Sequence, residues 1–196
     1  MARGKEFDVE RAVDAAVDRF WRHGYENSSV RDLARTMGIT GTSLYNAYGD
    51  KRALFTRSLE RYADRSMRER IARLQAAHQP RQAIEAFLRE IVERSLADRQ
   101  RKGCLLVNSA LDVAPHDAAL AKVVAGYLEE IRHFFQRNLE AARHNGALDR
   151  HLNARQVSTH LLGVVIAVRV LARTGAGRQD LEAVLAPALE LLERRH

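Results

Sequence analysis

Apolar side chains recur every three or four residues along almost the whole chain, and this spacing limits the possible folds more than any other feature. In the first segment the apolar stripe comprises Val9, Val13, Ala16, Val17, Phe20 and Trp21. Residues at this spacing share one face of a helix, which can be buried against a core. Only three prolines interrupt the 196 residues. The pattern therefore predicts an all-α protein.

Capping residues and glycines divide the chain into about nine expected helices. The expected N-caps include Asp8, Ser29, Thr40 and Asp50, and Gly24, Gly38 and Gly49 are expected to end the first three helices. The expected segments are about 8–24, 29–38, 40–49, 50–74, 80–96, 104–113, 116–145, 153–174 and 179–194.

Helix length separates two expected domains. Residues 1–52 hold three short helices and are expected to form a small head. Residues 53–196 hold longer helices with broad apolar faces and are expected to form a larger body, joined to the head by the fourth helix. Pro187 should bend or break the last helix, because proline lacks a backbone N–H.

Charge and cysteine content limit the partners and the compartment. The formal net charge is +7, which favours polyanionic partners such as nucleic acid. The single cysteine, Cys104, excludes an intrachain disulfide and fits a reducing compartment. The N-terminus lacks the apolar run of a signal peptide. The longest apolar stretch, residues 161–171, is short and contains Arg169, so we expect a cytoplasmic protein without a membrane span.

Residues 29–51 have the spacing of a helix-turn-helix. Ala34 leaves room for a second helix to cross closely, Gly38 suits a turn with positive φ, and Leu44 anchors the second helix. The other face of that helix is then free for the major groove. The expected DNA-binding residues are Ser29, Thr40, Gly41, Thr42, Ser43, Tyr45, Asn46 and Lys51. An ordinary helical hairpin with Gly38 as its C-cap has the same spacing.

The stretch SVRDLARTMGITGTSLYNAYGDKRALF resembles the DNA-binding head of the TetR/AcrR family of regulators. The resemblance covers about residues 7–55. It includes the Val-Arg-Asp-Leu-Ala run, the Gly-Ile-Thr turn, and an aromatic residue before Gly-Asp-Lys. It implies a recognition helix over residues 40–46, with Tyr45 and Lys51 on the DNA backbone. The chain differs at Gly41, where family members often carry a basic residue.

The last two expected helices are candidates for a homodimer interface. The segment 157–171 is apolar almost all round, so it must be covered on two sides. A four-helix interface with a second subunit, which is the usual mode of the family, or burial within one chain would cover it. The expected interface residues are Leu161, Val165, Val168, Leu185, Leu189 and Leu192. Two identical heads would read a near-palindromic site in double-stranded DNA.

The middle helices could enclose a cavity for an unknown small-molecule effector. The candidate lining residues are Phe87, Cys104, Asn108, Tyr127 and Phe134, although aromatic residues at this spacing also suit an ordinary core. Cys104 follows Arg101 and Lys102 at the start of a helix, an environment that favours a reactive thiolate. The segment GCLLVNSALDVAP also resembles family regulators in which a Gly-Cys senses electrophiles or oxidants. The alternative is a small buried apolar residue.

Motifs for catalysis, cofactors and metals were not found in the sequence. It has no glycine-rich phosphate loop, no GxSxG, no HExxH and no paired cysteines. We therefore expect no enzyme, cofactor or metal. The predicted function is a sequence-specific transcriptional regulator, a repressor released from its operator by a small ligand or by thiol modification. A structural protein that coats DNA without sequence preference or ligand control is the alternative.

Overall fold

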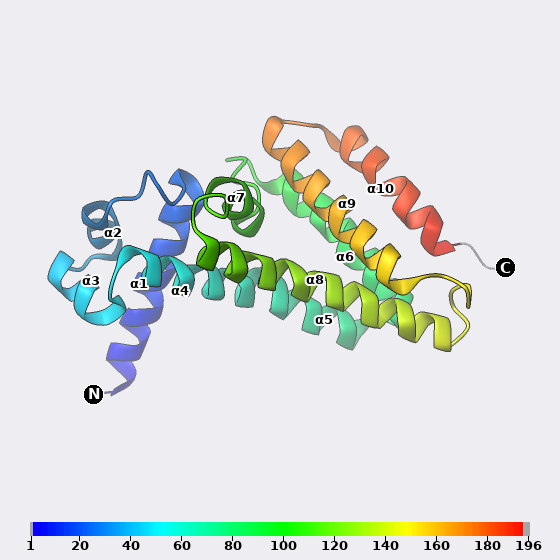
Figure 1. The fold of residues 1–196 in the computed structure, drawn as a ribbon, viewed down its shortest axis with the longest axis horizontal. Helices are drawn as coiled ribbons and strands as arrows, with labels where there is room; N and C mark the ends of the chain where they lie inside the picture. Colours follow the sequence, from blue (N-terminus) through cyan, green and yellow to red (C-terminus); the bar gives the residue numbers. More distant parts are fainter. Residues whose placement is uncertain (1, 194–196) are drawn as a thin grey trace. The chain divides into compact units, whose positions relative to one another are not determined.

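The computed structural model describes the backbone of residues 2–193 and the side chains of residues 10–193. Within these residues every regular element is a helix (Figure 1). The elements are α1 (Ala2–His23), α2 (Val30–Met37), α3 (Gly41–Tyr48), α4 (Lys51–Ala63), the π-helix η1 (Asp64–Arg68), α5 (Glu69–Ala77), α6 (Pro80–Ala97), α7 (Leu105–Asp112), α8 (Ala118–His144), α9 (Ala154–Thr174) and α10 (Arg178–Glu193). Because α4, η1 and α5 follow one another without a break, the described residues form nine helices, as expected.

The structure differs from the expected helices, or adds to them, at three places. α1 begins at Ala2 rather than after Asp8, because no proline separates residues 2–8 and the helix extends through them. The side chains of Asp8 and Val9 lie outside the described residues. The fourth helix contains a π-helical turn with Met67 buried, which the apolar spacing did not indicate. Pro187 was expected to bend or break the last helix. α10 continues through Pro187, so the helix is not broken there.

The chain forms two compact units that do not follow the sequence order. The first unit contains the chain through Ser66 together with Cys104–Ala125, and the second contains Met67–Gly103 together with the chain from Gly126 onward. The expected domain boundary between residues 52 and 53 stays a prediction. The first unit therefore contains α7 and the first two turns of α8 as well as the three short helices.

The core of the first unit lies where α1 packs against both α2 and α4. Phe20 and Phe55 are each 1% exposed and meet edge to face, with ring centroids 4.9 Å apart. Tyr25 contacts both rings: it stacks on Phe20 at 6.1 Å and lies tilted against Phe55 at 4.8 Å. Such aromatic contacts add to the burial of apolar area. This cluster supports the segment that leads from α1 into α2.

The core of the second unit lies between longer helices. α6 packs on α5, α9 and α10, and α9 packs on α10; Figure 1 shows α9 and α10 side by side. Three phenylalanines fill this core, with ring centroids 5.2–5.3 Å apart: Phe87, Phe134 and Phe135. All three are at most 1% exposed.

Candidate nucleic-acid interface

Side-chain caps set the start of α2. The Ser29 hydroxyl accepts a hydrogen bond from the Asp32 N–H (3.1 Å) and donates to Asp32 Oδ2 (2.8 Å). This bond holds the pKa of the Asp32 carboxyl below its ordinary value. Arg19 and Arg35 also contact that carboxylate, at 3.4 and 3.0 Å. Ser29 caps α2 as predicted, and its hydroxyl is already engaged within the protein.

The turn between α2 and α3 depends on Gly38. Its φ is 69° and its ψ is 28°, the left-handed region that side chains with a Cβ disfavour. Its N–H and the Ile39 N–H donate to carbonyls at the end of α2, so α2 ends in a tight turn. Thr40 then starts α3 by accepting from the Ser43 N–H at 3.0 Å. This geometry is the one predicted for a helix-turn-helix.

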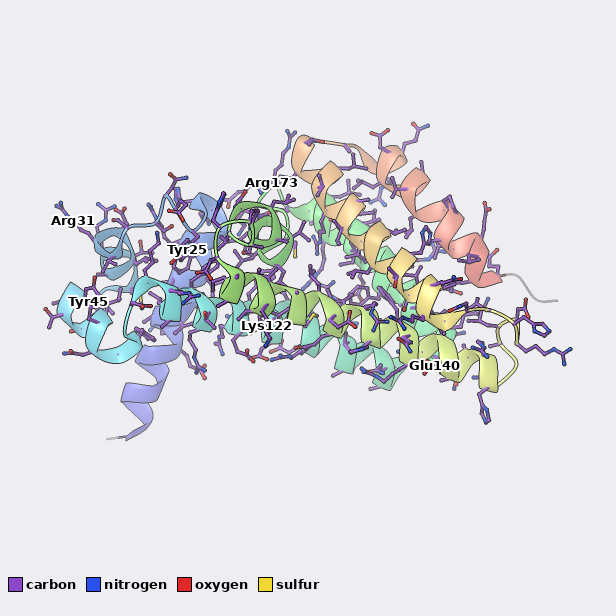
Figure 2. All side chains as sticks on the ribbon, viewed as in Figure 1. Tyr25, Arg31, Tyr45, Lys122, Glu140 and Arg173 are labelled. Atoms are coloured by element: carbon purple, nitrogen blue, oxygen red, sulfur yellow. The ribbon has the colours of Figure 1, made fainter. Side chains whose placement is uncertain are left out.

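Burial fixes which face of α3 points outward. Leu44 is fully buried and Ala34 is 5% exposed, so the two helices pack as the spacing predicted. Tyr45 is 53% exposed, and Figure 2 shows it at the outer side of α3, with Arg31 on α2. The remaining exposed polar residues of the face are Thr42, Ser43 and Asn46. The structure therefore presents a short polar helix face of the kind that enters a major groove.

Two hydroxyls on this face have structural partners. Thr40 Oγ1 lies 2.9 Å from Ser43 Oγ, in addition to its capping bond. Thr42 and Asn46 have no such bonds among the described residues, and their side chains are exposed. Gly41 is half-buried at the first position of α3. Thr42 and Asn46 are thus the freest polar groups for contacts with base edges.

The Lys51 ammonium is held in place at the start of α4. It lies 4.2 Å from the centre of the Tyr25 ring and donates to the Glu26 carbonyl at 3.5 Å. A cation over an aromatic face is attracted by the electron density of the ring. Burial raises the pKa of Tyr25, with a smaller contribution from Glu26, so its ring stays a neutral phenol at neutral pH. Sequence reasoning missed Tyr25, because the partner lies 26 positions away.

Arg52 connects the first turn of α4 to the start of α8 within the first unit. Its guanidinium donates to Asp117 Oδ1 at 2.6 Å. The same carboxylate oxygen accepts from the Ala119 and Leu120 N–H groups at 3.0 Å, so Asp117 also caps α8. The hydrogen bond from Arg52, with these backbone bonds, holds the pKa of Asp117 below its ordinary value. Sequence analysis did not single out either residue.

The five candidate effector residues do not share one unit. Cys104 and Asn108 belong to the first unit, where Cys104 is a half-buried free thiol directly before α7. Phe87, Tyr127 and Phe134 belong to the second unit. There the two phenylalanines form part of the core cluster, and the Arg68 guanidinium lies 5.6 Å from the Tyr127 ring centre. A shared effector cavity stays a prediction.

Most of the expected interface residues are buried within the chain itself. Five of them are at most 5% exposed within the single chain, so their role in a dimer interface stays a prediction: Leu161, Val165, Val168, Leu185 and Leu192. Leu189 is half-buried. The same helices expose other apolar side chains, with Val170 at 38% and Leu171 at 36%. A helix that is apolar all round does not reveal from sequence which side faces inward.

Comparisons with known proteins agree with this geometry. Residues 12–57 match the family described as bacterial regulatory proteins of the tetR family, and residues 80–187 match the tetracyclin repressor-like C-terminal domain. The chain belongs to the TetR family. It is therefore a DNA-binding transcriptional regulator, a class of protein distinct from enzymes.

Individual TetR family members are similar over most of their length. The HTH-type transcriptional regulator YezE of Bacillus subtilis is 31% identical over 177 residues, which cover 85% of this chain and 91% of YezE. The HTH-type transcriptional repressor ComR of Escherichia coli is 25% identical and covers 96% of this chain and 90% of its own. A regulator from Chloroflexus aurantiacus shares the fold, with a TM-score of 0.87 at 21% identity, covering 100% of this chain and 98% of its own.

Two of the similar structures contain DNA, and both are cysteine mutants of the same regulator. A cysteine mutant of the TetR family regulator CifR, in complex with a 26-base-pair double-stranded operator, has a TM-score of 0.83 at 30% identity. The match covers 92% of this chain and 95% of CifR.

Proposed function

We propose that the chain is a homodimeric repressor that binds a near-palindromic operator through α3 and is released by a signal received elsewhere in the chain. The observation that carries the proposal is the exposed polar face of α3, held outward by buried Leu44. The operator-bound CifR structure and the repressor ComR support it. Since such a protein must reach the chromosome, we expect it in the cytoplasm.

We assign different roles to the residues of the interface. Thr42 and Asn46 contact base edges, because their side chains are exposed and make no capping bonds. Tyr45 and Lys51 contact phosphates. Ser29, Thr40, Gly41 and Ser43 shape the N-termini of α2 and α3, whose backbone N–H groups favour phosphate.

The test compares Lys51→Ala with Lys122→Ala, which removes an exposed lysine of α8 in the same unit. Lys51→Ala should weaken binding to all DNA sequences and reduce the slope of log K against log salt by about one. Lys122→Ala should leave both unchanged. Equal affinity of the wild-type protein for operator and random DNA would favour the coating protein instead. Unchanged salt dependence in Lys51→Ala would contradict the phosphate contact.

We propose that the exposed sides of α9 and α10 form the dimer interface. Only 28% of the residues in the most apolar stretch of α9 are buried within the chain. By length and composition alone α9 could also cross a membrane, which the count of uninterrupted apolar residues did not indicate. However, Arg169 on α9 donates to the buried Ser95 hydroxyl at 3.1 Å, which places its charge against α6. A second copy is therefore the covering we favour.

Val170→Glu tests this interface, with Leu111→Glu as the control. Leu111 on α7 is 63% exposed, so both changes place a carboxylate at an exposed apolar position. Val170→Glu should give monomers and lose operator affinity, because an unpaired charge buried in an interface is costly. Leu111→Glu should remain dimeric. Light scattering that shows the opposite pattern would place the interface elsewhere.

Two signals for release remain as proposals, a small ligand in the predicted cavity and modification of Cys104. The half-buried thiol at the start of α7 supports the second. Iodoacetamide should then label Cys104 at neutral pH and release operator DNA, whereas Cys104→Ser should bind DNA and ignore the reagent. Labelling without release would leave the ligand as the signal.

A further inference from the structure

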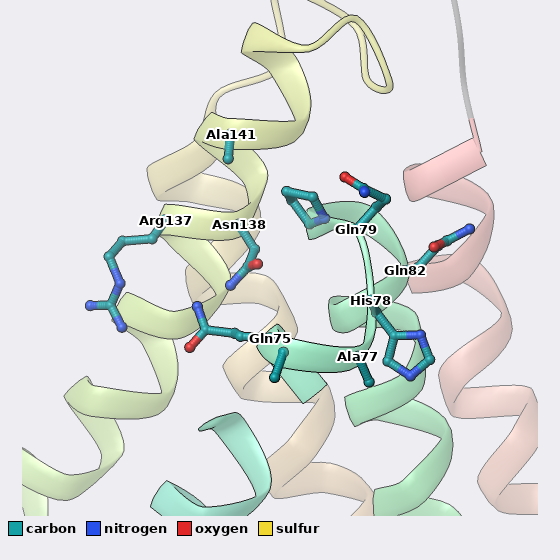
Figure 3. Close-up of a pocket in the computed structure, with 10 residues that line it drawn as sticks. Gln75, Ala77, His78, Gln79, Gln82, Arg137, Asn138 and Ala141 are labelled. Atoms are coloured by element: carbon teal, nitrogen blue, oxygen red, sulfur yellow. The ribbon is translucent and has the colours of Figure 1, made fainter. Parts of the chain in front are cut away.

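A cleft of about 620 Å³ lies in the second unit, between the α5–α6 turn and the C-terminal half of α8 (Figure 3). None of its lining residues belongs to the predicted DNA-binding residues or to the five residues predicted to bind an effector. Its polar lining comes from four amide side chains, one histidine and one arginine: Gln75, Gln79, Gln82, Asn138, His78 and Arg137. None of the lining residues is acidic. This composition suits a polar ligand with a negative group.

Asn138 provides the most specific polar group of this cleft. Its side chain is 6% exposed and lines the cleft. Its Nδ2 donates to the Phe134 carbonyl at 2.8 Å, which fixes the amide orientation. Its Oδ1 accepts no hydrogen bond from the described residues, and Figure 3 shows the amide facing the cleft near Gln75. A carbonyl oxygen that faces the cleft and has no donor within the protein can accept a hydrogen bond from a ligand, such as one with a hydroxyl group.

Positive potential enters the cleft from two sources. Arg137 makes no ion pair with the described residues, and Glu140, the next carboxylate along α8, accepts from Gln136 instead. The N-terminus of α6 borders the cleft through Gln79, Pro80 and Gln82. Gln79 provides no side-chain cap, so the first N–H groups of this 18-residue helix lack that partner. Such a terminus attracts phosphate.

We propose that this cleft binds a small phosphorylated sugar or polyol. The phosphate lies at the α6 N-terminus and Arg137, and hydroxyl groups donate to Asn138 Oδ1 and bond the glutamine amides. The volume falls within the range of about 300–1,000 Å³ typical of small-molecule sites. Binding does not depend on the proposed repressor function, because every group involved lies in the second unit.

The test is calorimetry on the full-length protein without DNA, with glucose 6-phosphate as the probe. Glucose and inorganic phosphate serve as its two halves. The complete probe should bind at least about tenfold more tightly than either half, because the charged and the hydroxyl-bonding groups act together. No binding of the probe at millimolar concentration would overturn the proposal. Phosphate binding as tightly as the probe would overturn the sugar component.

Three variants locate the site. Arg137→Gln should weaken glucose 6-phosphate about tenfold or more, as expected for a lost charge-assisted bond. Asn138→Ala should weaken it and leave phosphate binding unchanged. If Asn138→Ala unfolds, Gln75→Ala, at an exposed position, replaces it. This variant should also weaken glucose 6-phosphate binding and leave phosphate binding unchanged. Arg150→Gln removes an exposed arginine that does not line the cleft and should have no effect. Equal weakening in Arg150→Gln, or none in Arg137→Gln, would contradict the assignment.

Discussion

The short helices of the first unit and the long helices of the second are stabilised in different ways. α2, α3 and α4 each begin at a side-chain cap, provided by Ser29, Thr40 and Asp50. α6 has no side-chain cap and buries one face against three other helices. Ion pairs join distant helices in both units, as between Arg178 and Glu93 (2.9 Å) in the second and Arg52 and Asp117 (2.6 Å) in the first. Side-chain caps set the starts of the three short helices, whereas packing against three other helices holds α6.

This difference predicts which residues affect DNA binding and which affect the stability of the fold. α3 contributes only one buried residue, Leu44, and exposes Thr42, Tyr45 and Asn46. α6 buries seven residues, and its packing against three other helices forms part of the core of the second unit. Changes on the exposed face of α3 should therefore affect DNA binding, and changes in the core of the second unit should affect folding.

The largest expected effect comes from Phe134→Ala in the core of the second unit. Removing this fully buried ring should lower the free energy of unfolding by about 3–5 kcal/mol. Urea unfolding at fixed protein concentration measures it. Tyr45→Ala on α3 should change that free energy by less than about 0.5 kcal/mol and reduce operator affinity. A large loss of stability in Tyr45→Ala would show that the exposed face of α3 also contributes to folding, which contradicts the comparison.

Two glycine substitutions should have opposite signs. Gly38→Ala should destabilise by about 1–2 kcal/mol, because the new Cβ disfavours the positive φ of the turn. Gly126→Ala, in the middle of α8 with open space around it, should stabilise by about 0.5–1 kcal/mol. Urea unfolding of both variants provides the measurement. The same sign at both positions would show that backbone conformation does not govern the turn.

Tyr25→Leu should weaken operator binding without removing a phosphate contact. Loss of the ring beneath Lys51 is expected to cost about 0.5–2 kcal/mol of binding, a factor of about 2–30. The salt slope should stay at the wild-type value, in contrast to Lys51→Ala. Tyr25→Phe keeps the ring and should bind normally. A reduced slope in Tyr25→Leu would mean that the lysine itself no longer contacts phosphate.

The smallest expected effect is the pH dependence supplied by Asp14. A hydrogen bond from Arg61 on α4, opposed by burial and assisted by Arg65, lowers the pKa of Asp14 below its ordinary value of 3.8. A depressed pKa stabilises the fold above the unfolded-state value, and this stabilisation is lost as the pH falls through the folded-state value.

Asp14→Asn should therefore lower stability at pH 7, by less than about 1 kcal/mol because the pair is partly exposed. The difference from the wild-type protein should shrink as the pH falls below 3.8. Urea unfolding across this range checks it, with Asp112→Asn, an exposed carboxylate at the end of α7 in the same unit, as the control. A difference that is independent of pH would assign the effect to packing.

The features that the sequence could predict depend on contacts between residues that are close together in the chain. The helix-turn-helix follows from Ala34, Gly38 and Leu44 because their contacts are separated by ten residues or fewer, and its caps are local as well. The Arg52–Asp117 pair joins residues 65 positions apart, so no local pattern indicates it. The inward face of α9 was also unpredictable, because apolar residues surround that helix. The number of helices could be predicted from the apolar periodicity. The π-helical turn at Asp64–Arg68 could not, because the same periodicity fits a regular α-helix through these residues.

The order of synthesis gives the discontinuous first unit a further consequence. The three short helices emerge from the ribosome early, but Cys104–Ala125 completes the same compact unit. At about 5–20 residues per second, synthesis reaches Ala125 several seconds after Ser66. During that interval Arg52 lacks Asp117, and the cap of α8 does not yet exist. A nascent chain therefore carries its DNA-binding helices before it carries the residues that complete their support.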